Sequence, residues 1–287
     1  MPTFFSPVSG SPYSARSESK REIKRKALRR ATAHNLERHG HQCWLHATTG
    51  RGQPNETRAL HSSIGIDLTI QIYAPPEASL ARELEPHPCL QVIDVAATDL
   101  MQVPAFTVRQ LLDQADSYDL VCYLEDDILI EDPEFFEKIY RLIELTECSY
   151  VFMPHRCERI PGLGDVILSG DPDVAWSDLF WATGETLQFD SWIGPRRFYR
   201  AANPHSGCFV LSSEQGLKLR QYWQEREWKD AFRFAGPLEH AATGLLLPVL
   251  KVMKPVPEHY RCLMVRHQDE IWRRVPLPPS AAAGNQP

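Results

Sequence analysis

The chain has 287 residues, 43% of them hydrophobic and 24% charged, and its formal net charge is −6. This length is enough for one large domain or two small ones, and the composition is ordinary for a globular protein. The mild negative charge argues against a dedicated nucleic-acid-binding protein, which would normally be basic. No apolar stretch is long enough to cross a bilayer and no hydrophobic signal core is present, so we expect a cytoplasmic protein without a transmembrane segment.

The first part of the chain is polar and basic. Residues 1–18 are rich in Ser, Pro and Gly, and we expect them to be flexible, as we do the tail at 275–287. A helix is predicted at 20–38, with seven Lys or Arg residues between positions 20 and 30. The simplest interpretation of this run is a solvated helix face. The alternative is a peripheral contact of the basic helix with an anionic membrane surface or polymer.

Beyond this helix, segments with strand periodicity alternate with segments with helix periodicity. Strands are predicted at 42–48, 66–73, 90–95, 120–124, 149–154, 207–212 and 261–266, and helices at 105–117, 133–147, 213–231 and 237–250. Between 155 and 203 the sequence has little periodicity, and we expect a long functional loop there. The alternation predicts an α/β sheet within one domain.

An acidic triplet directly follows the apolar run at 120–124. A short apolar run without alternation is typical of a strand buried on both faces, as in a parallel sheet covered by helices. Glu125, Asp126 and Asp127 then place three negative charges together, which is costly unless a cation is present. Hard oxygen ligands at this point suit Mg²⁺ or Mn²⁺ holding a substrate diphosphate.

The alternative is that these acids are solvated loop residues or caps of the next helix. Asp132 and Pro133 already supply an N-cap and a first helical position, so the triplet is not needed as a cap. The triplet also follows a run without polar residues, which puts it at the edge of a sheet rather than in a long surface loop. Both details favour a metal or nucleotide site.

Three blocks of sequence are informative as an ordered set. They are Tyr-Leu-Glu-Asp-Asp at 123–127 with Asp-Pro-Glu-Phe-Phe at 132–136, Asn-Pro-His-Ser-Gly-Cys-Phe-Val-Leu at 203–211, and Gly-Pro-Leu-Glu-His-Ala-Ala-Thr at 236–243, followed by Lys254-Pro255 and His267. The set resembles a bacterial group of GT-A glycosyltransferases, in which a DxD-type motif binds a divalent ion and a nucleotide-sugar. The resemblance covers about residues 117–268. It implies a single GT-A (Rossmann-like) domain at 19–274, with a mostly parallel central sheet flanked by helices.

The resemblance also implies roles for the triplet. Asp127 is the expected direct metal ligand, Glu125 is a second ligand or a neighbour of the ligands, and Asp126 contacts ribose or metal-bound water. GT-A enzymes often add a ligand near the C-terminus, and His267 stands at that place. Because imidazole tolerates Mn²⁺ better than Mg²⁺, this ligand would favour manganese. The alternative for His267 is an ordinary surface or core residue.

Glu239 is the expected general base. It matches the acidic position that GT-A enzymes place near the acceptor hydroxyl, and an inverting transfer needs one carboxylate to take the acceptor proton. The alternative is structural, because the helix dipole favours Glu in a first turn. We expect Asn203, His205 and Ser206 to contact the donor or acceptor sugar, and Arg200 to contact a phosphate. Trp176, Trp181 and Trp192 are the expected wall of the acceptor site, and ordinary packing is the alternative for each of them.

These expectations describe a metal-dependent glycosyltransferase. It would move a sugar from a nucleoside-diphosphate sugar to an unknown acceptor, which is a glycan, a lipid-linked molecule or a small molecule. A nucleotidyltransferase is the first alternative, although it would normally show a Gly-rich phosphate loop near the first strand, and the sequence has no such loop. The second alternative is a non-catalytic GT-A-like protein that holds a glycan or a partner.

Overall fold

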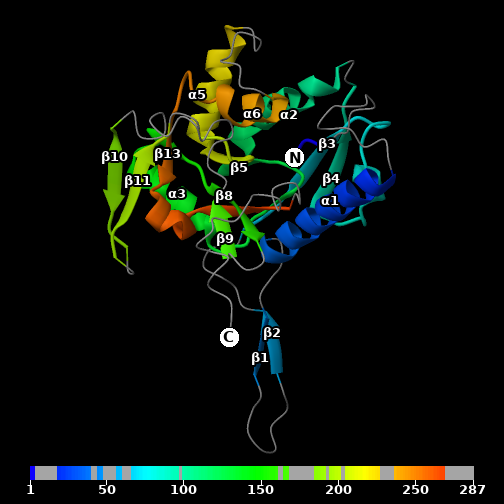
Figure 1. Cartoon of the computed structure of the whole chain (residues 1–287), viewed down its shortest axis with the longest axis horizontal. Helices are drawn as coiled ribbons and strands as arrows, with labels where there is room; N and C mark the ends of the chain where they lie inside the picture. Colours follow the sequence, from blue (N-terminus) through cyan, green and yellow to red (C-terminus); the bar gives the residue numbers. More distant parts are fainter. Residues whose placement is uncertain are drawn as a thin grey trace, which may run out of the picture.

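The computed structural model describes residues 1–3, 18–39, 44–47, 56–59, 66–96, 99–160, 164–167, 184–191, 194–201, 204–226 and 236–268. These residues form a mixed α/β protein with helices on both sides of the strands (Figure 1). The helices are α1 (Glu18–His39), α2 (Val103–Asp113), α3 (Phe135–Leu145), α5 (Ser213–Gln224) and α6 (Pro237–Glu239), the last continued by a π-helical turn at His240–Gly244. Short 3-10 helices lie at Ala81–Glu83, Leu100–Gln102, Ala115–Ser117 and Pro257–Cys262.

The described strands form two four-stranded and three two-stranded sheets. One sheet has the order β10 (Thr186–Phe189), β11 (Arg196–Arg200), β13 (Lys251–Pro255) and β7 (Tyr150–Phe152). Another has the order β6 (Ile128–Leu129), β14 (Met264–His267), β8 (His155–Ile160) and β9 (Gly164–Ile167). The pairs are β5 (Leu120–Leu124) with β12 (Cys208–Ser212), β3 (Ile70–Ala74) with β4 (Leu90–Asp94), and β1 (Trp44–Ala47) with β2 (Glu56–Ala59).

The prediction of a mostly parallel central sheet is wrong. Six of the nine strand pairings among the described residues are antiparallel. β5 itself pairs antiparallel with β12, which places Leu124 opposite Cys208 and Leu120 opposite Ser212. An unbroken apolar run indicates burial on both faces. Because an antiparallel pair covered by helices satisfies that condition as well as a parallel sheet does, the run does not fix strand direction.

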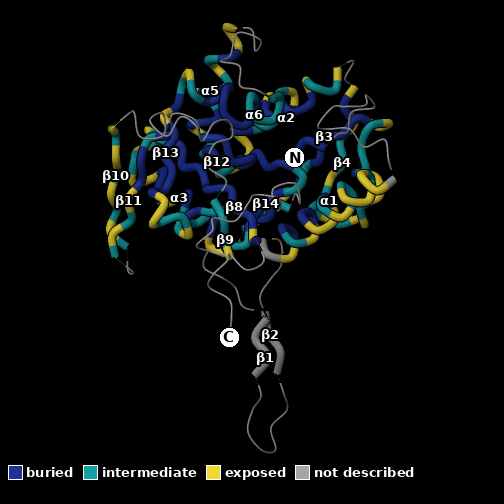
Figure 2. The backbone as a smooth tube through the Cα atoms, in the orientation of Figure 1, coloured by how far each residue is buried: buried dark blue, intermediate teal, exposed yellow. Residues whose placement is uncertain are grey.

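The two faces of β5 pack against different helices. Val121 and Tyr123 belong to a core shared with α2, α5 and the turn after α6, whereas Leu124 belongs to a core shared with α1 and α3. Successive strand residues point to opposite faces, so this alternation follows from the strand geometry. Tyr123 also stacks on Phe209 of β12, with ring centroids 5.3 Å apart. Figure 2 shows the resulting buried centre of the molecule.

Two helix boundaries have clear chemical causes. α5 begins with a capping box, in which the Ser212 side chain accepts from Gln215 N–H and the Gln215 side chain accepts from Ser212 N–H. α3 begins at Phe135, so the prediction of Asp132 as its N-cap is wrong. Asp132 instead accepts from Glu134 N–H at 3.0 Å and from Lys138 Nζ at 2.7 Å, and it stabilises the turn before the helix.

The segment at 155–203 is not one long loop, because it contains β8, β9, β10 and β11. In β8 the sequence His-Arg-Cys-Glu-Arg-Ile places charged side chains on a buried face, so a search for apolar periodicity misses this strand. The predicted helix at 237–250 is also shorter than expected: it becomes α6, the π-helical turn and a series of turns.

Met1–Thr3, at the start of the segment expected to be flexible, lie parallel to β3, with Tyr73 N–H donating to the Met1 carbonyl at 2.9 Å. Of the helices in the described ranges, none combines the length and apolar character needed to cross a bilayer.

Candidate active site

Glu125 leaves β5 at a point fixed by β12. Its backbone N–H donates to the carbonyl of Gly207 at 2.9 Å, and its side chain is buried. Gly207 has a φ of +69°, and a Cβ at this position would lie 2.8 Å from Glu125 Oε2. Glycine at 207 therefore accepts a left-handed backbone and leaves room for the carboxylate.

Asp127 and His267 are held opposite each other by strand pairing. Ile128 of β6 pairs with His267 of β14, and Gln268 N–H donates to the Asp127 carbonyl at 2.9 Å. This arrangement places His267 Nε2 3.3 Å from Asp127 Oδ2. Nδ1 of the same ring lies 2.7 Å from Oε1 of Glu158, on the neighbouring strand β8. His267 is therefore bracketed by two carboxylates.

These contacts determine the charges of the pair. Burial acts to lower the pKa of His267, but Asp127 and Glu158 outweigh it and raise this pKa to about 10. Burial acts to raise the pKa of Asp127, but the charge and hydrogen bond of His267 lower it to about 2. At neutral pH the pair is an imidazolium facing a carboxylate. The imidazolium thus supplies positive charge among the acids, as a bound cation would.

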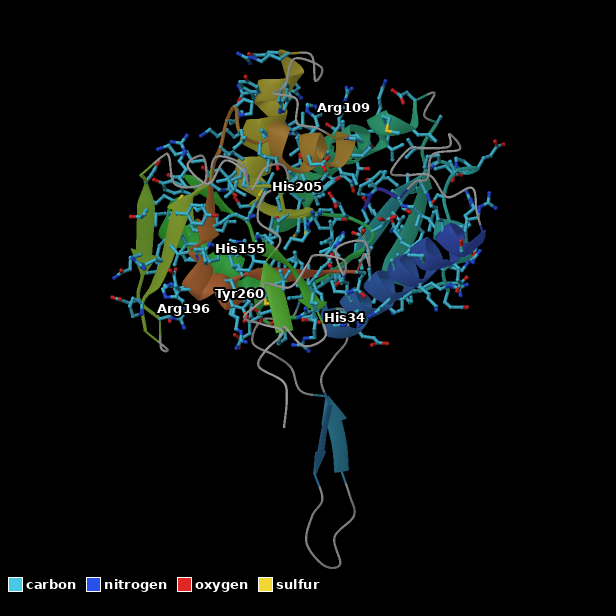
Figure 3. The ribbon with its side chains drawn as sticks, in the orientation of Figure 1. His34, Arg109, His155, Arg196, His205 and Tyr260 are labelled. Carbon is cyan, nitrogen blue, oxygen red and sulfur yellow. The ribbon has the colours of Figure 1, made fainter. Side chains whose placement is uncertain are left out.

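Glu125 has no comparable partner. Burial and the charge of Asp127 raise the pKa of Glu125 to about 8, although Arg156 Nη1 lies 4.0 Å from its Oε2. His205, shown in the interior in Figure 3, has its Nε2 3.8 Å from Glu125 Oε1. Burial lowers the pKa of His205 well below its usual value, so this ring is neutral. The carboxyl of Glu125 is therefore largely protonated at pH 7.

Four acids of this region each have a buried oxygen that accepts no hydrogen bond from any residue the structure describes. The atoms are Glu125 Oε1, Asp127 Oδ1, Glu158 Oε2 and Glu239 Oε2. Glu239 belongs to the same group, because its charge contributes to the raised pKa of Glu125. We call these four side chains, with His267, the acid cluster. Buried polar atoms are normally satisfied, so these oxygens are candidate contacts for a ligand.

The oxygens of the acid cluster fit the chemistry of a hard divalent cation such as Mg²⁺ or Mn²⁺. Their arrangement is not a ready-made site, because within the described ranges no three His, Cys, Asp or Glu side chains are grouped so that they could hold a metal ion. Both ring nitrogens of His267 face carboxylates. For His267 to become a ligand, its ring must lose a proton and release Asp127 or Glu158.

Glu239 approaches the acid cluster from the helical side. It ends α6, which begins after Gly236 with Pro237 at its first position, a favourable start for a helical turn. The Glu239 side chain is half-buried, and its Oε2 is enclosed. One Glu239 oxygen is therefore enclosed without a hydrogen-bond donor among the described residues.

The other members of the triplet and of the 203–211 block have structural partners. Ser206 Oγ donates to the Cys208 carbonyl at 2.9 Å, within the turn that leads into β12. Asp126 is half-buried, and burial raises its pKa, whereas the charge of Lys24 on α1 and a hydrogen bond from Thr3 act to lower it. Asp126 therefore connects the site with α1.

The structure does not bring Arg200 to the acid cluster. Arg200 lies on β11, with Nη1 3.3 Å from Glu185 Oε2, and Glu185 also accepts from Tyr150 and Lys251. The remaining expected contacts, Asn203, Trp176, Trp181 and Trp192, lie outside the described residues.

Two buried residues of the site, Arg156 and Glu158, were missed in the sequence. Both lie on β8, within the segment expected to be a loop, and residues two apart on a strand share a face. The parallel pairing of β8 with β14 places this face beside His267. The spacing of Arg156 and Glu158 is the signal that could have shown a charged strand face.

A buried lysine lies behind the cluster. Lys254 of β13 is fully buried, and its Nζ donates to the His205 carbonyl at 3.3 Å. Burial, with the charge of Arg156, lowers the pKa of Lys254 from 10.5 to about 7. Between these two pH values the unfolded chain binds more protons than the folded one, so the folded state loses stability as the pH falls from about 10.5 to 7.

We expect Lys254→Met to stabilise the protein by roughly 2–4 kcal/mol at pH 7, and by less than about 1 kcal/mol at pH 10, because the apolar side chain carries no cost of burying a charge. Chemical denaturation at both pH values measures the change. The control is Lys251→Met on the exposed part of the same strand, which should change the free energy of unfolding by less than about 0.5 kcal/mol. A loss of stability in Lys254→Met, or a gain that does not depend on pH, would contradict the assignment.

Comparison with known proteins does not supply a function. No protein-family model matches the sequence, and no curated protein matches it. The function has to be argued from the acid cluster itself.

Proposed function

We propose that the protein is a metal-dependent glycosyltransferase that uses the acid cluster to transfer a sugar from a nucleoside-diphosphate sugar to an acceptor hydroxyl. The observation that carries the proposal is the group of buried carboxylate oxygens without hydrogen-bond partners around Asp127 and Glu125. Buried, unsatisfied acids are costly, and proteins retain them mainly where a ligand completes them. The order of sequence blocks that resembles GT-A enzymes points to the same substrate class.

Asp127 and Glu125 would hold the cation, with His267 joining them once it releases Asp127. A divalent cation at this place would supply positive charge to the leaving diphosphate. Manganese fits better than magnesium if His267 takes part, because imidazole nitrogen is a poor ligand for Mg²⁺. Binding should also release protons, since Glu125 and His267 carry them in the absence of a ligand.

Glu239 would act as the general base. In an inverting transfer, the acceptor oxygen attacks the anomeric carbon while the bond to the diphosphate breaks, and the hydroxyl proton passes to a carboxylate. Oε2 of Glu239 is enclosed and accepts no hydrogen bond from the described residues, so it has capacity for that proton. Neutral His205, beside Glu125, is suited to hydrogen bonding with sugar hydroxyls rather than to pairing with charge.

The proposal is tested by calorimetric titration of the protein with UDP and with GDP, each with and without Mn²⁺, followed by a hydrolysis screen across nucleotide-sugars. We expect one nucleoside diphosphate to bind only when Mn²⁺ is present, and its sugar conjugate to be slowly hydrolysed. Binding without hydrolysis or transfer would instead identify a non-catalytic binding protein. The absence of binding for both nucleotides in Mn²⁺ would contradict the proposal.

A further inference from the structure

The basic residues of the chain are concentrated on α1. Residues 18–30 contain seven Lys or Arg and two Glu, in a chain whose net charge is −6. The rest of the molecule is therefore more acidic than the total, and α1 is a positive element on a negative protein. Such an asymmetry creates a local potential that attracts anions even though the whole protein repels them.

One face of α1 packs on the protein and the other is left to solvent. Leu28, Ala31 and Leu36 are buried against the core, and Asn35 fixes the helix to β6 by accepting from Ile130 N–H and donating to the Ile128 carbonyl. The opposite face runs along the outer edge of the molecule in Figure 2. Its exposed residues include Lys20, Ile23, Lys26, Arg29 and Arg30.

Part of this charge is not paired with a carboxylate. Arg25 is paired with Glu22 and Glu83, and Arg29 donates to the Glu83 carbonyl. Lys26 and Arg30, by contrast, make no ion pair with any residue in the described part of the chain. Exposed like charges held this close repel one another, so an anionic surface would stabilise them.

We propose that the outer face of α1 docks on an anionic lipid surface. The partner must be anionic because the exposed residues of this face are positively charged. Two further features favour a membrane over a nucleic acid. Ile23 is 48% exposed among the basic residues, which suits contact with the apolar layer beneath lipid headgroups. In addition, residues 18–39 contain no Phe, Tyr or Trp, so the helix lacks the large aromatic side chains on which single-stranded bases most often stack.

The docked orientation has a consequence for the acid cluster. Lys24 lies one helical turn from Lys20 and its charge acts on Asp126, which stands between Glu125 and Asp127 of the acid cluster in the chain. A membrane bound to α1 would lie on the element whose Lys24 acts beside the acid cluster. This step rests on the proposed function: it assigns the acceptor to the lipid-linked class, with a headgroup hydroxyl delivered at the membrane surface.

The test is sedimentation of the full chain with vesicles of neutral phosphatidylcholine, or of phosphatidylcholine with about a third phosphatidylglycerol, in the absence of metal and nucleotide. We expect binding to the anionic vesicles only, with release as the salt concentration rises from about 0.1 to 0.5 M. Each Lys or Arg near an anionic surface changes partitioning by about fivefold, so the triple variant K20Q/K26Q/R30Q should partition about 100-fold less.

The matched control is the triple variant R141Q/R197Q/K218Q, which removes three positive charges from exposed positions outside α1 and should partition like the unmodified protein. Circular dichroism of both variants reports whether they fold. Equal binding to neutral vesicles, no binding to anionic vesicles, or a triple variant within about threefold of the unmodified protein would each overturn the proposal. So would binding to polyphosphate or DNA without binding to vesicles. Because no nucleotide is present, these outcomes are independent of the test of glycosyl transfer.

Discussion

An Asp127→Asn variant should fold but should lose metal-dependent nucleotide binding. Asp127 is the one member of the acidic triplet whose pKa lies well below the ordinary range, at about 2, so it is fully ionised under all ordinary conditions. The amide keeps the size of the side chain and one carbonyl oxygen, but it removes the negative charge that a cation requires. The loss of affinity should exceed the roughly 10–100-fold cost of changing a group that only touches a metal ligand.

Folding should survive this change. His267 retains its contact with Glu158 at 2.7 Å, and the Asn oxygen can still accept from Nε2, so the cost should be on the order of 1–2 kcal/mol. The control is Asp119→Asn, an exposed acid directly before the first residue of the same strand, which should change neither binding nor stability. Undiminished calorimetric binding of Mn²⁺ and nucleotide by folded Asp127→Asn would remove Asp127 from the metal site.

The position of the acidic triplet could be predicted from the sequence, whereas the direction of the sheet could not. The run at 120–124 is a buried strand, and the acids follow its last residue. The apolar content of a strand indicates whether both of its faces are covered. Whether the strand pairs parallel or antiparallel depends on neighbouring strands that are distant in the sequence. Here β12 supplies an antiparallel partner from nearly ninety residues further along the chain, about which the local pattern of β5 contains no information.

The site was only partly predictable for a similar reason. His267 contacts Asp127 across about 140 residues of chain, and Glu239 is near enough for its charge to act on Glu125. Arg156 and Glu158 were missed because charged residues on a buried strand face look like a loop when only apolar periodicity is searched. Their burial makes sense only with the pairing of β8 and β14, which brings opposite charges beside His267.

For Glu239, a structural role and a catalytic role predict very different effects of mutation on the rate of transfer. Glu in the first turn of a helix gains a few tenths of a kcal/mol, roughly, from the helix dipole. α6 is only three residues long, from Pro237 to Glu239, so this gain is a weak reason for enclosing a carboxylate oxygen without a partner. A role as proton acceptor for the incoming hydroxyl is a stronger reason, because a general base needs a lone pair that no other hydrogen bond occupies.

We therefore expect Glu239→Gln to retain donor binding and to lose about 10²–10⁴-fold in the rate of transfer, since the amide is nearly isosteric but cannot take a proton. Single-turnover transfer rates, measured with an acceptor from the hydrolysis and transfer screens, are the readout. Glu214→Gln is the matched control: Glu214 also lies in a first helical turn, that of α5, but it is exposed and distant from the acid cluster in the fold. If Glu239 only stabilises its helix, both variants should lose a few tenths of a kcal/mol, roughly, and transfer should stay within about threefold of the unmodified protein. A selective collapse of transfer in Glu239→Gln, with nucleotide affinity preserved, is the result that only a base at this position produces.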